Sequence, residues 1–340
     1  MIEVRNVSRS FRSTKKAPGF AGAMQLLFKP EIQTHFALKD VSFNVEPGSF
    51  VGLIGANGAG KTTLLKILSG LIPPTEGSTR VLGYNPFERP LDFRRKIALV
   101  MGQKAQLWWD LPANDAFDLL HAIYDIPDKL YRERVQILSE LLDVKQHLQT
   151  QIRRLSLGER MKMELIGAIL HWPSVIFLDE PTIGLDVMAA AKLREFLKVF
   201  NQREKSTIIL TSHNMDDIER LCSRVLILRA GELIYDGKPA GLLREGERRL
   251  KVRFSLVPDL EELSRITRLP LNQISVAMSE RAEDPDLAPE TGGVYFTLKQ
   301  DQIVPVLQIL MQHGTIIDMG IEEQSLESVI QRVFEGGIKP

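Results

Sequence analysis

The sequence predicts an α/β fold, with antiparallel N-terminal strands, a parallel sheet and a helical subdomain, followed by a smaller α+β domain. Short apolar strands alternate with helices up to about residue 240, which is typical of a parallel sheet. The run 175–178 has no polar alternation, as expected for a strand buried on both faces. After residue 241 the expected order is strand-helix-strand-strand-helix-strand, which is the ferredoxin-like order.

The expected elements divide the chain into residues 1–240 and 241–340. In the first part we expect strands at 1–11, 38–45, 50–54, 97–100, 175–178, 207–211, 225–228 and 233–235, and helices at 63–69, within 111–148, and at 156–170, 188–200 and 216–221. In the second part we expect strands at 250–255, 274–278, 294–298 and 315–319, and helices at 260–266, 302–312 and 326–334.

Two stretches of the first part are interpreted as insertions. Residues 104–160 form the helical subdomain. Residues 12–36 separate the first two strands, and within them 20–28 place apolar side chains on one helical face. That segment is either a short amphipathic helix facing a membrane or a partner, or a solvated loop.

Composition narrows the possible classes of protein. The 340 residues are enough for two domains, and 43 basic residues balance 43 acidic ones. A net charge of zero does not favour a nucleic-acid partner. The single cysteine, Cys222, excludes a disulfide framework within the chain and suits a reducing cytosol. No signal peptide and no membrane-spanning apolar run is evident, so a membrane role would need a second chain.

A phosphate-binding loop follows the strand at 50–54. The sequence from Gly55 to Thr62 matches G-x-x-x-x-G-K-[ST] between an apolar strand and a helix. Glycines let backbone N–H groups point at phosphates, and the helix N-terminus favours anions. We expect Lys61 to lie between the outer phosphates and Thr62 to contact Mg²⁺. The expected nucleotide-binding residues are Gly55, Asn57, Gly58, Ala59, Gly60, Lys61, Thr62 and Thr63.

Two carboxylates end the apolar strand at 175–178. Asp179 and Glu180 emerge at its carboxyl end, where open α/β sheets bind ligands. Asp179 fits the role of a Mg²⁺ partner through water, and Glu180 is placed to polarise an attacking water beside a γ-phosphate. A helix-capping pair is the alternative, but the upstream phosphate loop favours catalysis.

The hexapeptide 155–160, LSLGER, resembles the signature motif of ATP-binding-cassette (ABC) ATPases, usually written LSGGQ or LSGGE. The resemblance covers about residues 1–240 and implies a P-loop NTPase cassette that hydrolyses ATP with Mg²⁺. It also implies roles for four further positions. These are Gln103 as the Q-loop glutamine that touches Mg²⁺, Asp186 of the D-loop, His213 as the switch histidine on the γ-phosphate, and Phe11 as the aromatic that stacks on adenine. Phe36 is an alternative to Phe11, and core packing is the alternative for both.

In this family two copies pack head to tail, and each signature closes over the ATP of the other copy. The resemblance therefore implies a homodimer or heterodimer, with Ser156, Leu157, Gly158 and Glu159 acting on the partner's nucleotide. Leu157 replaces the first glycine of the motif. We expect its side chain to turn away into a partner surface rather than hinder closure.

The insertion and the C-terminal domain resemble those of exporters for drugs, lipids or surface polysaccharides. This implies an ATPase at the cytoplasmic face of the membrane, bound peripherally to a separate polytopic permease, with no nucleic-acid partner. Trp108 and Trp109 either form part of the docking surface for a coupling helix or are buried under the helical insertion. The alternatives are a soluble ABC ATPase of translation or DNA repair, and an importer ATPase. Residues 241–340 serve as a dimer brace or as a regulatory ligand module.

Overall fold

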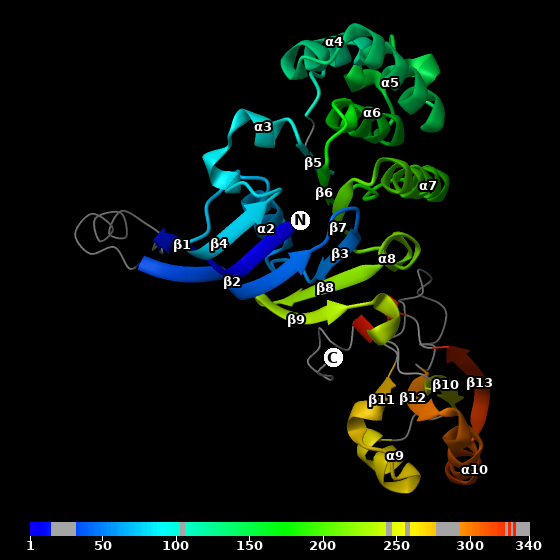
Figure 1. The fold of residues 1–340 in the computed structure, drawn as a ribbon. Helices are drawn as coiled ribbons and strands as arrows, with labels where there is room; N and C mark the ends of the chain where they lie inside the picture. Colours follow the sequence, from blue (N-terminus) through cyan, green and yellow to red (C-terminus); the bar gives the residue numbers. More distant parts are fainter. Residues whose placement is uncertain are drawn as a thin grey trace, which may run out of the picture. The chain divides into compact units, whose positions relative to one another are not determined.

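The computed structural model describes residues 1–14, 32–102, 106–242, 247–255, 259–276, 293–323, 326–327 and 329–330. Two compact units make up the chain, Met1–Pro239 and Ala240–Pro340. The first unit has the predicted α/β architecture with a helical subdomain, and the second is α+β (Figure 1). No helix among the described residues is long and apolar enough to span a membrane.

A six-stranded sheet of described residues forms the centre of the first unit. Its order is β5-β6-β7-β3-β8-β9, parallel from β5 to β8, with β9 antiparallel to β8. The bounds are β3 (Phe50–Gly55), β5 (Ile97–Met101), β6 (Val175–Asp179), β7 (Thr207–Thr211), β8 (Arg224–Arg229) and β9 (Glu232–Gly237). Every residue of β3 and β7 is buried, which explains their lack of polar alternation. The parallel strands end at one edge, and polar residues follow them there.

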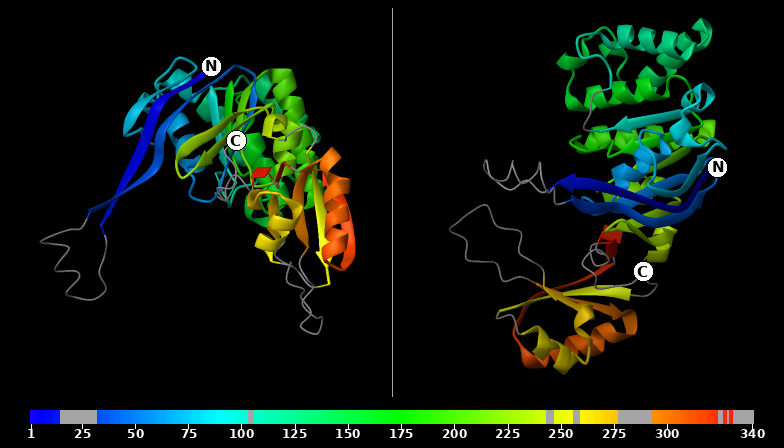
Figure 2. Two further views of the ribbon diagram at one scale, coloured as in Figure 1. Left: turned by 90° about the horizontal axis from the view of Figure 1, so that it is seen from below. Right: turned by 90° about the vertical axis from the view of Figure 1, so that its left-hand side faces the viewer.

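A second, antiparallel sheet contains β1 (Ile2–Thr14), β2 (Ile32–Val45) and β4 (Glu76–Val81), in the order β2-β1-β4. β1 pairs with β2 from Ile2↔Val45 to Thr14↔Ile32, and Figure 2 shows the pair as a long two-stranded ribbon. The strands therefore extend into both ends of the stretch 12–36, which the sequence analysis treats as an insertion. The possible helix at 20–28 lies outside the described residues.

The strand β4 is not among the strands that the sequence predicts. Its residues EGSTRV are mostly polar, and only Thr79 and Val81 are buried. No apolar alternation marks such a strand, so pairing with β1 decides its conformation rather than its own pattern.

Helices surround the central sheet, and α4, α5 and α6 lie together as the helical subdomain (Figure 1). The expected helical stretch 111–148 is interrupted. Asp125 ends α4 with a left-handed backbone (φ 53°), and Pro127 precedes the first residue of α5. The helices of this unit are α2 (Lys61–Leu68), α3 (Leu91–Arg94), α4 (Ala113–Tyr124), α5 (Asp128–Leu141), α6 (Leu157–Ile169), α7 (Val187–Glu204) and α8 (Met215–Leu221), with 3₁₀ turns at Pro86–Glu88, Lys145–His147 and Ile152–Arg154.

The second unit confirms the ferredoxin-like order. Its strands are β10 (Glu247–Phe254), β11 (Ile274–Val276), β12 (Val294–Lys299) and β13 (Ile316–Glu323), antiparallel in the order β11-β12-β10-β13. The helices α9 (Leu260–Thr267) and α10 (Ile303–His313) contribute Leu263 and Leu310 to the core of this unit. Of the expected last helix, only residues 326, 327, 329 and 330 are described, and they are helical.

A half-buried histidine joins the helical subdomain to the central sheet. The His171 ring stacks on Tyr124 of α4, with ring centres 3.9 Å apart and planes within 3°. Its Nε2 lies 3.0 Å from the carbonyl oxygen of Ile97, at the start of β5. A carbonyl only accepts hydrogen bonds, so this geometry assigns the proton of the neutral ring to Nε2. Burial lowers the pKa of His171 from 6.5 to about 4.

We predict that protonation of His171 destabilises the fold at acid pH. The unfolded chain binds this proton near pH 6.5, whereas the folded chain binds it only near pH 4. The free energy of unfolding should therefore fall by roughly 3 kcal/mol from this group as the pH drops through that window, and the loss should level off below it. His171→Phe keeps a ring against Tyr124 but does not titrate. Urea unfolding between pH 7.5 and 4 should show a smaller loss of unfolding free energy for this variant than for the unaltered chain. Parallel curves for the two proteins would contradict the assignment.

Candidate functional site

The loop between β3 and α2 depends on glycines. Gly58 and Gly60 have left-handed backbones, with φ of 80° and 105°. A Cβ on Gly60 would lie 2.4 Å from the carbonyl oxygen of Ala37, so no side chain fits there. Gly60 is also the N-cap of α2 and offers no side-chain cap. The first backbone N–H groups of an α-helix have no partner within the helix, so this loop presents donors suited to an anion.

The other predicted loop residues take different positions. Gly55 is packed so closely that a Cβ would lie 2.6 Å from the carbonyl oxygen of Leu228. Ala59 is buried beneath the loop, Asn57 is exposed at its surface, and Thr63 is half-buried in the first turn of α2. The close packing at Gly55 fixes the start of the loop against β8.

The Lys61 ammonium group is held by carbonyl oxygens. Its Nζ donates to Gly55 O at 2.6 Å and to Ala56 O at 3.1 Å, and the residue is only 6% exposed. It forms no ion pair with a carboxylate of the described residues. Burial lowers its pKa, against the opposing effect of the negative charges on Glu180 and Asp179. A buried cation of this kind, beside free N–H donors, fits a phosphate group.

Both carboxylate oxygens of Asp179 accept hydrogen bonds from threonine hydroxyls. Oδ2 accepts from Thr62 at the start of α2 at 2.8 Å, and Oδ1 accepts from Thr211 at the end of β7 at 2.7 Å. The carboxylate and the Thr62 hydroxyl are hard oxygen donors, the type that Mg²⁺ prefers. These residues therefore fit a magnesium site. Gln103, the third expected Mg²⁺ contact, lies outside the described residues.

The side chains of Glu180 and His213, both predicted to act at the γ-phosphate, lie in contact with each other. The Nε2 atom of His213 is 2.8 Å from Oε1 of Glu180. Glu180 has a left-handed backbone (φ 54°), and its N–H donates to both Oγ1 and O of Thr211, at 3.0 and 3.1 Å. Strained positions of this kind occur where the surrounding structure fixes them. The left-handed backbone of Glu180 changes the direction of the chain immediately after β6.

Gly102 makes that turn possible and was not singled out from the sequence. Its N–H donates to Asp179 O at 2.8 Å, and a Cβ there would lie 2.3 Å from the carbonyl oxygen of Glu180. Any side chain at position 102 would displace the backbone that carries both acids. The adjacent Gln103 is the only signal in the sequence that marks this position.

A buried ion pair fixes the two loops that carry Glu180 and His213. Asp217 is fully buried, and its Oδ1 accepts from Arg194 of α7 at 2.8 Å. Its Oδ2 accepts from the hydroxyls of Thr182 and Ser212, both at 2.6 Å. Thr182 follows Glu180, and Ser212 precedes His213. Asp217 therefore positions both segments, although the sequence marks it only as an acid in the first turn of α8.

The predicted signature forms the N-terminus of α6. Ser156 is its N-cap and forms a capping box with Glu159. The Ser156 hydroxyl donates to Glu159 Oε2 at 2.8 Å and accepts from Glu159 N at 3.3 Å. His147 Nε2 lies 2.9 Å from Glu159 Oε1. The hydrogen bonds from Ser156, followed by the charge of His147, lower the pKa of Glu159. This network holds the first turn of α6 in place.

Leu157 and Gly158, the two residues after Ser156, differ in how they pack within their own chain. Leu157 is 39% exposed, and its Cδ2 lies 2.8 Å from where a Cβ of Gly184 would be, so the leucine contacts the predicted D-loop. A Cβ on Gly158 would lie 3.5 Å from Ala189 Cβ, an ordinary contact. Packing within the chain therefore does not require glycine at 158. In the same loop, Asp186 caps α7 by accepting from Ala189 N at 2.8 Å.

The aromatic residues of interest are on the surface. Phe11 and Phe36 are both exposed, so core packing is wrong for each of them. The guanidinium carbon of Arg9 lies 4.7 Å from the centre of the Phe11 ring. Trp108 and Trp109 are also exposed, which contradicts burial under the helical insertion. Arg160, at the signature, lies 5.3 Å from the Trp109 ring.

Comparison with known proteins agrees with this geometry. A family model described as ABC transporter matches residues 38–183. The chain is 32% identical over 237 residues to the ABC transporter ATP-binding protein NatA of Bacillus subtilis (strain 168). The aligned region covers 70% of this chain and 89% of NatA. It is 29% identical over 258 residues to methionine import ATP-binding protein MetN 2 of Enterococcus faecalis, covering 75% and 70% of the two chains. Nod factor export ATP-binding protein I of Cupriavidus metallidurans is 33% identical over 209 residues, covering 62% and 68%.

Solved structures show the same similarity. The ATP-binding cassette MJ0796, as a dimer in a post-hydrolysis state bound to ADP and Pi, superposes with a TM-score of 0.58 at 25% identity. The match covers 70% of this chain and 98% of that one.

We predict that Asp217→Asn destabilises the first unit by about 3 kcal/mol, because it leaves the buried Arg194 charge unpaired. Arg194→Met in the same chain removes that charge, so the double variant should lose less stability than the sum of the two single variants. Urea unfolding of the four proteins measures this coupling. Additive losses would show that the pair is not energetically coupled.

Proposed function

This chain belongs to the ABC transporter family of ATP-binding proteins, and from this premise we propose that it powers export through a separate membrane permease. It is an ATPase of that family. The observation that carries the site assignment is the convergence of Lys61, Asp179, Glu180 and His213 at the carboxyl edge of one parallel sheet. In open α/β sheets this edge is where ligands bind.

We propose that the loop from Gly55 to Thr63 binds the phosphates of ATP. The N–H groups at the start of α2 and the Lys61 ammonium would neutralise phosphate charge. Thr62 and Asp179 would hold Mg²⁺, together with Gln103. When bound, this ion neutralises charge that develops on the phosphate oxygens during transfer.

We assign hydrolysis to Glu180, with His213 as its partner. The Glu180 carboxylate would accept a proton from the attacking water, and the ring of His213, 2.8 Å away, would orient that carboxylate and contact the γ-phosphate. Asp217 supports both loops through Thr182 and Ser212, so the distance between the two side chains is set by buried groups.

We further propose that two copies of the cassette form the complete site. Gly158 has room for a side chain within its own chain, so a glycine there serves close approach by something outside the chain. Ser156 and Glu159 hold the same turn ready, and Asp186 lies across from it at the start of α7. The partner's bound nucleotide is the group that this turn would meet. The similarity to a dimeric cassette supports this arrangement.

For the membrane partner we propose docking beside Trp108 and Trp109. Exposed aromatic residues favour the cores of protein interfaces. The permease would bind here through a cytoplasmic segment, which places the ATPase at the cytoplasmic face of the membrane. The balanced net charge and the transporter names of the similar proteins argue against a nucleic-acid partner and a role in translation or repair.

Import is the second candidate function. The similarity to a methionine import protein spans 75% of this chain, while the similarity to a Nod factor export protein spans 62%. We favour export because the sequence of the C-terminal domain resembles that of exporter ATPases, and the second unit has the ferredoxin-like order. We propose that residues 241–340 are an accessory domain, acting as a dimer brace or a regulatory ligand module.

We predict that Glu180→Gln lowers ATP turnover by at least about 100-fold, because the amide cannot act as a base. The variant should still bind ATP and accumulate as an ATP-stabilised dimer, measured by light scattering with and without ATP. The matched control is Glu195→Gln, at an exposed position of α7, which should hydrolyse ATP like the unaltered chain. Persistent hydrolysis by Glu180→Gln would rule out this residue as the base.

We predict that Phe11→Ala weakens ATP binding by about tenfold, the loss expected when one aromatic stack on a base is removed. Phe36→Ala is the comparison, because register places Phe36 opposite Ser10, next to Phe11. Titration with a fluorescent ATP analogue measures both. A loss confined to Phe36→Ala would transfer the adenine contact to that residue.

A further inference from the structure

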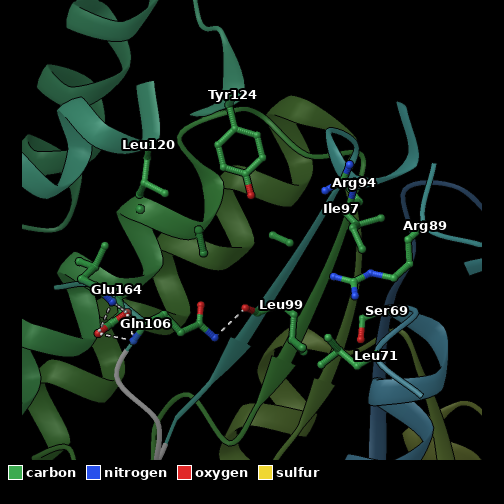
Figure 3. Close-up of a pocket in the computed structure, with 14 residues that line it drawn as sticks. Ser69, Leu71, Arg89, Arg94, Ile97, Leu99, Gln106, Leu120, Tyr124 and Glu164 are labelled. Atoms are coloured by element: carbon green, nitrogen blue, oxygen red, sulfur yellow. Dashed lines mark hydrogen bonds between the residues drawn. The ribbon is translucent and has the colours of Figure 1, made fainter. Parts of the chain in front are cut away.

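A buried carboxylate in the middle of α6 has no role in the site described above. Glu164 is only 5% exposed and forms no ion pair with a described residue. One oxygen accepts from the N–H groups of Gln106 and Leu107 at 3.0 and 3.3 Å, and the other accepts from the same groups at 3.0 and 3.1 Å. Figure 3 shows these bonds on the wall of a pocket of about 260 Å³.

The segment that Glu164 binds begins three residues after Gln103. The Gln106 side chain also donates through Nε2 to Leu99 O of β5 at 2.9 Å, as Figure 3 shows. Leu107 packs against α6 at Gly167, where a Cβ would lie 2.9 Å from Leu107 Cδ2. This short segment is therefore attached to the sheet on one side and to α6 on the other.

The helix that carries Glu164 is the one that begins at the signature. Ser156 caps α6, and Glu164 lies about two turns further along it. Because an α-helix of this length is stiff, a displacement of Gln106 and Leu107 would move the first turn of α6 with it. The carboxylate is the polar link between the segment after Gln103 and the signature.

Packing alone does not need this carboxylate. Leu107, Leu120 and Gly167 already make an apolar contact at this point. Burial opposes the charged form and raises the pKa of Glu164, against the opposing effect of the two backbone N–H groups. Replacing Glu164 by an apolar residue would leave the N–H groups of Gln106 and Leu107 without this acceptor. The carboxylate therefore fixes the position of this segment relative to α6.

We propose that Glu164 is a positioning residue that makes the segment after Gln103 and the signature helix move as one unit. Through this clamp, a change at the nucleotide or at the docked permease would reach the turn that serves the partner's ATP. The proposal rests on the function proposed above, since it needs the signature to act on a nucleotide. The clamp itself is a property of one chain.

The test uses Glu164→Gln in the full chain. The amide has the same shape and keeps one oxygen acceptor, but it places an NH₂ group against the same two N–H donors, so the clamp is weakened. We expect kcat per folded molecule to fall about tenfold, while KM and the Kd for ATP stay within about threefold, because the phosphate loop is untouched. Glu133→Gln, at an exposed position of the neighbouring α5, is the control and should match the unaltered chain.

Hydrogen exchange gives an independent readout in the Glu180→Gln background, where no hydrolysis is needed. With an intact clamp, ATP should slow exchange at residues 106–107 and at the first turn of α6 in parallel. Adding Glu164→Gln should speed exchange at 106–107 and remove that parallel response. A kcat within twofold of the unaltered chain, or a parallel response that survives Glu164→Gln, would overturn the proposal. If the unaltered chain does not hydrolyse ATP, the proposed function fails, and exchange alone decides the clamp.

Discussion

The carboxylate of Asp179 connects three parts of the first unit. It lies at the end of β6 and accepts one hydroxyl from Thr62 of α2 and another from Thr211 of β7. Since the rest of β6 is buried, the sheet fixes the position of this carboxylate. Asp179 therefore fixes the positions of three neighbours, which are the phosphate loop, the adjacent strand β7 and the next residue, Glu180. Charge-assisted hydrogen bonds of this kind are short and directional, so they fix the orientation of the Asp179 carboxylate.

Around this centre, different polar contacts hold the two sides of the site. On one side, the buried pair of Asp217 and Arg194 anchors the loops that carry Glu180 and His213. On the other side, His171 lies 3.0 Å from Ile97 O of β5, and Glu164 accepts from Gln106, whose side chain donates to Leu99 O of β5. Polar links between packed elements define discrete arrangements better than apolar contact does. The signature lies on this second side.

The sequence predicts most where a motif residue with a chemical role directly follows an apolar strand. Gly60, Asp179, Glu180 and His213 each lie at the end of an apolar strand or in the loop after it, and Lys61 begins α2, so the motif and the strand together locate them in the chain. The apolar strands and the ferredoxin-like order followed from periodicity in the same way. The structure places Nε2 of His213 2.8 Å from Oε1 of Glu180, a contact that the sequence does not specify.

What the sequence missed depends on contacts between distant residues. Asp217 and Arg194 are 23 residues apart, and Glu164 and Gln106 are 58 apart, so no local pattern reveals either pair. The polar strand β4 and the ends of the β1–β2 ribbon are extended because a neighbouring strand pairs with them. Leu157 lies against Gly184 of its own chain and is still partly exposed, so its contact with a partner stays a prediction.

Disulfide trapping between two different chains tests the central claim, a site shared by two copies, most directly. One chain carries Leu157→Cys and the other Asn57→Cys, both with Glu180→Gln, and the natural Cys222 stays buried. Burial also raises the pKa of the Cys222 thiol, which keeps it unreactive. The account predicts that ATP with Mg²⁺ produces a cross-linked heterodimer in the mixture, and that neither chain cross-links to itself. Absence of the cross-link with ATP, or equal cross-linking without it, would contradict a signature that acts on the partner's nucleotide.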